Sequence, residues 1–282
     1  MDRARQLICC TMASALMLLL LGDADAQKSQ LLQNVELCNG ADRTSPDTQI
    51  NGCSALIDSG EQTPQALVIA YNNRGNAYTT KGEYDRAVQD YDRSIKLDPS
   101  YAKAFNNRGV AYQKKGEYDR AISDFDAAIK LDPNYASALA NRADTYLGKG
   151  DYERAVRDFD EAIRVKPTLE ALWNGRCWTK AIIGELQAAL ADCNEALRLD
   201  PNVGLTLDSR GLIYLKLGLW ELAIDDYSSA LRFDPKLASA LYGRGFAKLK
   251  NGDKTGEVDI AAAKAIEATI EGEFARYGVQ QP

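Results

Sequence analysis

The 282-residue sequence contains no histidine. Histidine is the side chain that most often exchanges protons near neutral pH, and it completes the Ser-His-Asp and Cys-His catalytic groups. Its absence excludes those mechanisms and every metal site with an imidazole ligand. Basic residues are also fewer than acidic ones, 34 against 40, which gives a net charge of −6. Such a chain lacks the basic surface of a general nucleic-acid binder, so we expect no nucleic-acid partner.

Long apolar runs are missing too, with one exception near the N-terminus. Residues 7–21 carry no charge, follow Arg3 and Arg5, and precede an Ala-Asp-Ala motif at 24–26. A basic start, an apolar centre and a small-residue cleavage motif are the three parts of a secretory signal peptide. We therefore expect residues 1–26 to be removed and the mature protein to be periplasmic or secreted, without integral membrane association. An uncleaved N-terminal anchor is the alternative.

The prolines reveal an internal repeat, because five of the eight recur every 34 residues. They are Pro99, Pro133, Pro167, Pro201 and Pro235. Counted from Val68, each of six successive units also has glycine at its fifteenth position. These glycines are Gly82, Gly116, Gly150, Gly184, Gly218 and Gly252. A fixed period of this length is typical of solenoid proteins.

Each unit contains two stretches in which apolar residues recur at helical spacing, as from Tyr84 to Ile95. The fifteenth-position glycine supplies the left-handed backbone that ends the first helix, and the proline ends the second. The short turn makes the two helices antiparallel neighbours. The eighth position, mostly glycine or alanine, then faces the twenty-fourth, mostly aromatic. One pair cannot bury its apolar face alone, so we expect an all-α stack of helix pairs.

In these positions the sequence resembles the tetratricopeptide-repeat (TPR) family, and in particular its small exported bacterial members. The resemblance is strongest in residues 68–135 and weakens at the end, where Glu257 stands in place of an alanine. It implies a right-handed α-solenoid of antiparallel helix pairs, the TPR superhelix. The six repeats expected are 68–101, 102–135, 136–169, 170–203, 204–237 and 238–271. A degenerate repeat at 27–67 precedes them, and a C-terminal cap or tail at 272–282 follows.

Four cysteines remain after cleavage of the expected signal peptide, and they allow three disulfide pairings. Cys177 and Cys193 occupy the eighth and twenty-fourth positions of one repeat, which face each other. We therefore predict the bonds Cys177–Cys193 and Cys38–Cys53. The rival interpretation, a thiol–disulfide oxidoreductase, is typical of a Cys-x-x-Cys motif at a helix N-terminus, and neither pair has that spacing. The same spacing disfavours a cysteine metal site.

The resemblance implies that the first helix of each pair lines a concave groove that holds a protein or peptide partner. In the first half this groove would offer an asparagine ladder for a peptide backbone, unless these amides bond locally. In the second half it would offer an apolar surface, unless a C-terminal helix with Ile266, Ile270, Phe274 and Tyr277 covers it. The predicted groove residues are Asn73, Asn76, Asn107, Asn141, Trp178, Leu212, Leu215, Tyr242 and Phe246.

A charged pattern accompanies the repeat. Arginine occupies the seventh position of all six units, and aspartate the twenty-third position of five, which places the two nearly face to face. We interpret them as ion pairs that fix the stacking of repeats. A stripe of arginines for phosphorylated or other anionic ligands is the alternative.

No nucleophile–base pair and no phosphate-binding glycine loop is found, so we expect no catalytic residue, no cofactor and no metal. The resemblance then implies a non-enzymatic scaffold or adaptor in the periplasm or secreted space. A structural component of envelope assembly is an alternative of another class, and a thiol-redox protein is a third.

Overall fold

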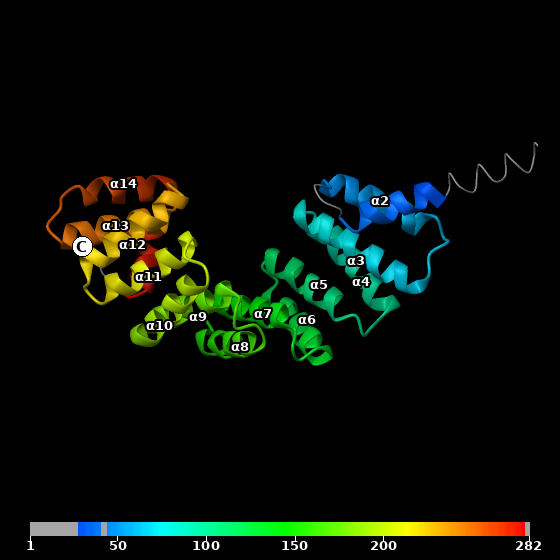
Figure 1. Ribbon diagram of the computed structural model, residues 1–282, viewed down its shortest axis with the longest axis horizontal. Helices are drawn as coiled ribbons and strands as arrows, with labels where there is room; N and C mark the ends of the chain where they lie inside the picture. The colour runs from blue at the N-terminus through cyan, green and yellow to red at the C-terminus, as the bar shows by residue number, and fades with distance from the viewer. Residues whose placement is uncertain (1–27, 41–43, 280–282) are drawn as a thin grey trace, which may run out of the picture. The chain divides into compact units, whose positions relative to one another are not determined.

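The computed structural model describes residues 28–40 and 44–279 (Figure 1). The predicted signal peptide, residues 1–26, lies outside the described residues. Every regular element within the described ranges is a helix, which confirms the all-α prediction. The chain divides into two compact units, Met1–Leu131 and Asp132–Pro282.

Helices of the first unit pack in sequence order. A helix at 28–38 is followed by α2 (Pro46–Asp58), α3 (Pro64–Thr80), α4 (Tyr84–Leu97), α5 (Ala102–Lys114) and α6 (Tyr118–Leu131). Each of α2 to α5 contacts the next helix, and α3 also contacts α5. The first helices of successive pairs are therefore neighbours, as in a stack of hairpins.

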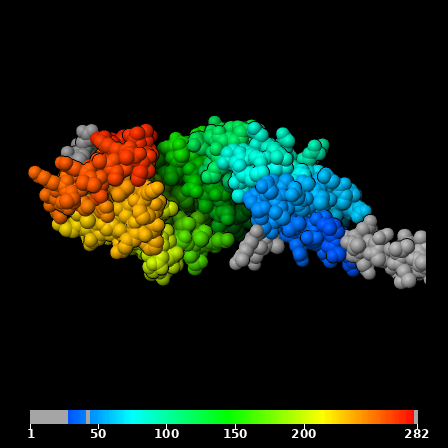
Figure 2. Space-filling model, turned by 90° about the horizontal axis from the view of Figure 1, so that it is seen from above, coloured from blue at the N-terminus to red at the C-terminus, as the bar shows by residue number. Residues whose placement is uncertain are grey.

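The second unit continues the same pattern, with nine helices between residues 132 and 279. They are α7 (Ala136–Lys149), α8 (Tyr152–Val165), α9 (Glu170–Ile183), α10 (Leu186–Leu199), α11 (Gly204–Lys216), α12 (Trp220–Phe233), α13 (Ala238–Lys250), α14 (Gly256–Ile266) and α15 (Ile270–Arg276). The first helices α7, α9, α11 and α13 contact one another in turn, and α15 contacts both α13 and α14. Figure 2 shows the C-terminal segment, in red, against the other helices of this unit.

The turn inside each pair has the backbone that the sequence predicts. All six fifteenth-position glycines, from Gly82 to Gly252, have positive φ values between 73° and 88°. Other L-residues adopt this left-handed conformation only with strain, so the glycines fix where the first helix ends.

Inside several pairs, a small residue on the first helix makes room for a ring on the second. A Cβ atom on Gly75 would lie 2.6 Å from the Tyr91 ring, and one on Gly109 would lie 2.7 Å from the Phe125 ring. Both rings are at most 1% exposed. Glycine therefore sets how closely the helices approach, and a larger residue would require the ring to move.

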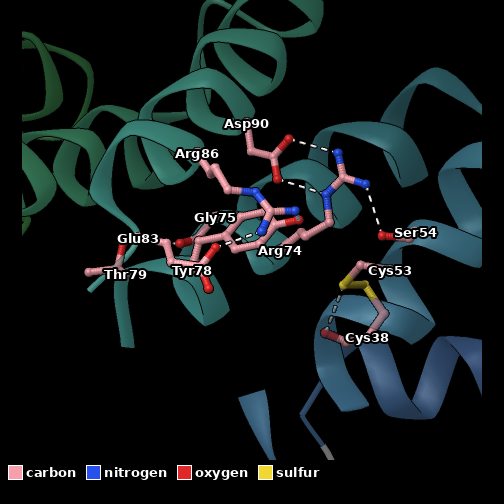
Figure 3. A network of polar contacts seen from close by, with 10 residues as sticks. All are labelled: Cys38, Cys53, Ser54, Arg74, Gly75, Tyr78, Thr79, Glu83, Arg86 and Asp90. Atoms are coloured by element: carbon pink, nitrogen blue, oxygen red, sulfur yellow. Dashed lines mark hydrogen bonds and ion pairs between the residues drawn. A yellow bond between two sulfur atoms is a disulfide. The ribbon is translucent and has the colours of Figure 1, made fainter. Parts of the chain in front are cut away.

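Cysteines replace this glycine–aromatic contact in one repeat. Cys177 on α9 and Cys193 on α10 are joined, with Cα atoms 5.4 Å apart, inside the range for a disulfide. Cys38 and Cys53 are joined in the same way, with Cα atoms 4.5 Å apart (Figure 3). This second bond ties the helix at 28–38 to α2. The two pairs are those that the repeat register predicts.

The arginine and aspartate positions form a ladder of ion pairs. In each pair the guanidinium Nε and Nη2 atoms donate to the two oxygens of one carboxylate, at 2.6–2.9 Å. The pairs are Arg74–Asp90, Arg108–Asp124, Arg142–Asp158, Arg176–Asp192, Arg210–Asp226 and Arg244–Asp259. The last partner is one residue out of register, because the final repeat is degenerate. All six guanidiniums are thus engaged, which favours the ion-pair interpretation over an anion-binding stripe.

Several of these arginines also reach back to the preceding repeat. Arg74 donates to Ser54, and Arg108 forms an ion pair with Asp92 (Figure 3 shows the first contact). One side chain therefore joins the two helices of its own pair and the second helix of the pair before it. The ladder fixes the register of stacking by geometry as well as by charge.

The ladder gives a first prediction, for Asp124→Asn. Asp124 is buried and bidentate to Arg108, so losing its charge should lower the free energy of unfolding by about 2 kcal/mol. The control is Asp92→Asn, which removes the second partner of the same arginine. The Asp92 side chain is 53% exposed, so this change should cost less than about 1 kcal/mol. Urea unfolding measures both, and equal losses would contradict the assigned roles.

Candidate functional site

The asparagines of the first unit bond mainly to one another. Asn106 donates to Asn107, Asn107 to Asn72, Asn72 to Asn73, and Asn73 to Asn39, over distances of 3.0–3.3 Å. This chain of amides crosses from α5 through α3 to the residue after the helix at 28–38. These side-chain amides therefore bond to one another, as the alternative of local bonding expects. Binding of a peptide backbone by them stays a prediction.

The other two predicted asparagines also have partners within the protein. The Asn76 side-chain oxygen accepts a hydrogen bond of 2.8 Å from the Tyr91 hydroxyl. That ring is the one that packs against Gly75, so Asn76 holds the core aromatic in place. On α7 the Asn141 carbonyl accepts from Thr145, and the Asn141 side chain is half-buried.

In the second unit the predicted apolar groove residues are covered. Leu212, Leu215, Tyr242 and Phe246 are only 1–4% exposed. As a prediction of exposed groove residues these four are wrong, and the alternative of cover by a C-terminal helix describes them. The reason is packing, since the cover has apolar residues of its own at helical spacing and burying both surfaces is favourable.

The cover consists of α15 and residues 277–279. Ile270 and Phe274 are each 2% exposed, and the Phe274 ring centroid lies 4.7 Å from that of Tyr242. Tyr277 packs its ring edge-on to Trp178, with centroids 5.2 Å apart. Ile266, also expected in the cover, is 50% exposed and lies at its margin.

Trp178 alone among the predicted apolar groove residues remains half-exposed, and it lines a cavity of about 410 Å³. The first helices of the second unit form one side of this cavity, and the α15 segment forms the other. The lining residues are Asp144, Leu147, Asn174, Gly175, Trp178, Leu205, Asp208, Ser209, Leu237, Ala238, Ser239, Glu267, Ile270, Glu273, Phe274 and Tyr277. Its volume lies in the range of ligand pockets.

Two residues that line this cavity each have a buried side-chain oxygen that lacks a hydrogen-bond partner among the described residues. They are Oδ1 of Asn174 and Oδ1 of Asp208. The other Asp208 oxygen accepts from the Ser239 hydroxyl at 2.9 Å. Leaving a buried acceptor unpaired costs about 1–3 kcal/mol, so a ligand that donates to these oxygens would recover that free energy.

Burial also raises the pKa of two acidic residues here. Asp208 is 7% exposed, and loss of hydration raises its pKa to about 7, although the Ser239 hydrogen bond partly opposes this. Burial raises the pKa of Glu273 as well, and the nearby Glu267 carboxylate adds to that increase. Both effects arise because the ionised form loses water or meets a like charge.

Sequence reasoning missed Asp208, although one signal was present. Asp208 occupies the fifth position of its repeat, where three other repeats have Asn72, Asn106 and Asn174. A carboxylate in place of a neutral amide marks this repeat as different. Only the packing around it, however, shows that the carboxylate is buried.

Two further findings bear on the kind of site. Within residues 28–40 and 44–279, no group of three or more carboxylate or cysteine side chains is arranged to hold a metal ion. In the same ranges, no helix combines the length and the apolar character needed to cross a bilayer.

Comparison with known families identifies the repeats. A model described as TPR repeat matches residues 75–116 and 211–252. Two models described as tetratricopeptide repeat match 102–135 and 125–157. No curated protein sequence matches the chain significantly.

Solved structures of low sequence identity share the fold. A tetratricopeptide repeat protein from Parabacteroides merdae is 17% identical, with a TM-score of 0.67, over 89% of this chain and 100% of that one. PilF of Pseudomonas aeruginosa is 18% identical, with a TM-score of 0.64, over 77% and 97%. YrrB, a TPR protein with an unusual peptide-binding site, is 20% identical, with a TM-score of 0.54, over 68% and 97%. The family matches therefore show that this chain contains tetratricopeptide repeats, and the solved structures share its fold of stacked helix pairs.

Proposed function

We propose that the protein is a non-enzymatic interaction module that binds an extended segment of a partner protein in the second unit. The observation that carries this proposal is the cavity of about 410 Å³ beside Trp178, with its two unpaired buried oxygens. A partner segment presents hydrogen-bond donors from its backbone and its side chains, and donors of either kind could pair with Asn174 and Asp208.

The fold itself supports this proposal, since the TPR scaffold is consistent with protein–protein interaction and TPR proteins are generally not enzymes. YrrB has a peptide-binding site on a similar scaffold. Trp178 adds an aromatic wall, and tryptophan is among the residues that contribute most to binding free energy at protein interfaces.

For the location we propose the periplasm or the secreted space. Two cysteine pairs at bonding distance suit an oxidising compartment, and the N-terminal pattern of charge and apolar residues suits export. In that setting an adaptor would recruit one partner to another. A structural component of envelope assembly is the second candidate, and stable oligomers of the purified protein would favour it.

Capture experiments test the binding proposal. Trp178→Ala should reduce recovery of the bound partner from an extract of the native compartment by about 30-fold, the loss of a contact worth about 2 kcal/mol. Trp173→Ala is the matched control. Trp173 is on the same helix but does not line the cavity, and its indole donates to the Pro167 carbonyl. Quantitative mass spectrometry reads out both.

Capture that is equally strong for the two variants would contradict the proposed site. Circular dichroism of each variant establishes that the helices are retained. Loss of capture in both variants together with loss of helicity would report unfolding rather than binding, and a Trp178→Leu variant, which keeps an apolar side chain of moderate size, would then separate the two effects.

A further inference from the structure

The cavity beside Trp178 carries charge of one sign. Four of its lining residues are acidic, namely Asp144, Asp208, Glu267 and Glu273. Among the described residues that line it, none is a lysine or an arginine. Carboxylates from three separate places in the second unit therefore meet at one hollow, which concentrates negative potential there.

Asp208 is the member of this group that most directly implies a ligand. It is more than nine-tenths buried, and its Oδ1 atom has no hydrogen-bond partner in the described part of the chain. The neighbouring Asn174 oxygen is also unpaired. Both groups are acceptors, so the complementary ligand is a donor, and a positively charged donor satisfies the charge as well.

Aromatic rings form a second and independent feature of the cavity. Trp178 and Tyr277 meet at an interplanar angle of 78°, and Phe274 lies 6.1 Å from Tyr277 between ring centroids. The faces of such rings attract organic cations, and tryptophan does so most strongly. A corner of aromatic rings beside the buried Asp208 carboxylate is suited to an ammonium or guanidinium group on an apolar stem.

A bare metal ion fits this arrangement less well. Divalent cations need several oxygen ligands converging at 2.0–2.6 Å, and no such group exists in the described ranges. The carboxylates are spread around the cavity, as they would be around a larger cation.

We propose that this cavity binds a lysine or arginine side chain of the partner segment. Asp208 is the buried counter-ion, Asn174 accepts a second hydrogen bond, and Trp178 and Tyr277 flank the stem. This inference rests on the proposed function, because it assigns the chemistry of the residue that the partner presents. It predicts that the partner segment has a lysine or arginine at the position that enters this cavity.

Nuclear magnetic resonance titration tests the assignment with three blocked amino acids at pH 8, where Asp208 is ionised. Nα-acetyl-lysine N-methylamide and its arginine counterpart carry the charge, and the norleucine counterpart carries a neutral stem of similar length. We expect at least one charged probe to shift the Trp178 indole and the amides of Asp208 and Ser209. Its affinity should exceed that of the norleucine probe at least tenfold.

Asp208→Asn should abolish this preference. Asparagine occupies the same position in three other repeats, so the fold should be retained. Asp225→Asn is the matched control, since it removes the same charge from the exposed surface of α12 and should leave binding unchanged.

Four results would overturn the proposal: equal binding of the norleucine probe, unchanged binding to Asp208→Asn, the same shifts with calcium chloride alone, or no binding of any probe. None of them would bear on capture of the partner through Trp178. If capture depends on Trp178 and the basic probes fail, the cavity binds a different side chain and the proposed function stands. If capture does not depend on Trp178, the proposed function fails first.

Discussion

Phe274→Ala is expected to lower the stability of the second unit by about 3–5 kcal/mol, the range for removing a buried aromatic side chain. Phe274 is 2% exposed and packs against Tyr242 and Tyr277. It belongs to the apolar cluster that also contains Leu212 and Phe246. Because α15 has only seven residues, loss of this contact should release the whole segment and uncover Tyr242, on which Phe274 packs.

Two measurements check this expectation. Denaturant unfolding gives the loss of stability, and binding of an apolar fluorescent dye to the native protein reports the uncovered surface. Phe233→Ala is the control, since Phe233 is 52% exposed at the end of α12 and should cost less than about 1 kcal/mol. If Phe274→Ala unfolds like the wild type and binds no more dye, then the Phe274 side chain does not hold α15 in place.

The repeat architecture could be predicted from the sequence because its determinants are local. Glycine at the fifteenth position ends a helix through its own backbone, and a proline ends the next through its ring. The eighth and twenty-fourth positions are close in sequence, so the contact between Gly75 and Tyr91 and the bond between Cys177 and Cys193 follow from one helical hairpin. The one-residue shift of Asp259 likewise appears in the sequence as a misplaced alanine pattern.

The site could not be predicted to the same extent, because its properties depend on contacts between distant segments. Position alone marks Leu212 and Tyr242 as groove residues, but the path of the chain after residue 266 decides that they are buried. The same path makes Trp178 one wall of a cavity instead of an exposed anchor. Asp208 resembles any other aspartate in the sequence, and only the packing of α11 against its neighbours removes it from water.

The burial of Asp208 leads to the second large effect, a loss of stability as pH rises. Burial raises the pKa of Asp208 from 3.8 to about 7 in the folded protein. Between these values the folded state holds a proton that the unfolded state has released. Folding therefore takes up a proton, and each pH unit costs about 1.4 kcal/mol, or about 4 kcal/mol in total, with no further loss above pH 7.

Asp208→Asn should remove this dependence, because the amide does not titrate. The difference in unfolding free energy between variant and wild type should grow by about 4 kcal/mol in favour of the variant from pH 4 to pH 8. The other titrating groups are the same in both proteins, so their contributions largely cancel in this difference. Asp225→Asn is the control, because it removes the same charge from an exposed position on α12, and it should follow the wild-type curve. Urea unfolding at each pH measures the three proteins, and parallel curves for Asp208→Asn and wild type would show that the buried carboxyl pays no cost for ionisation. In that case Asp208 already has access to water or to a cation, and the cavity would have to be open to solvent.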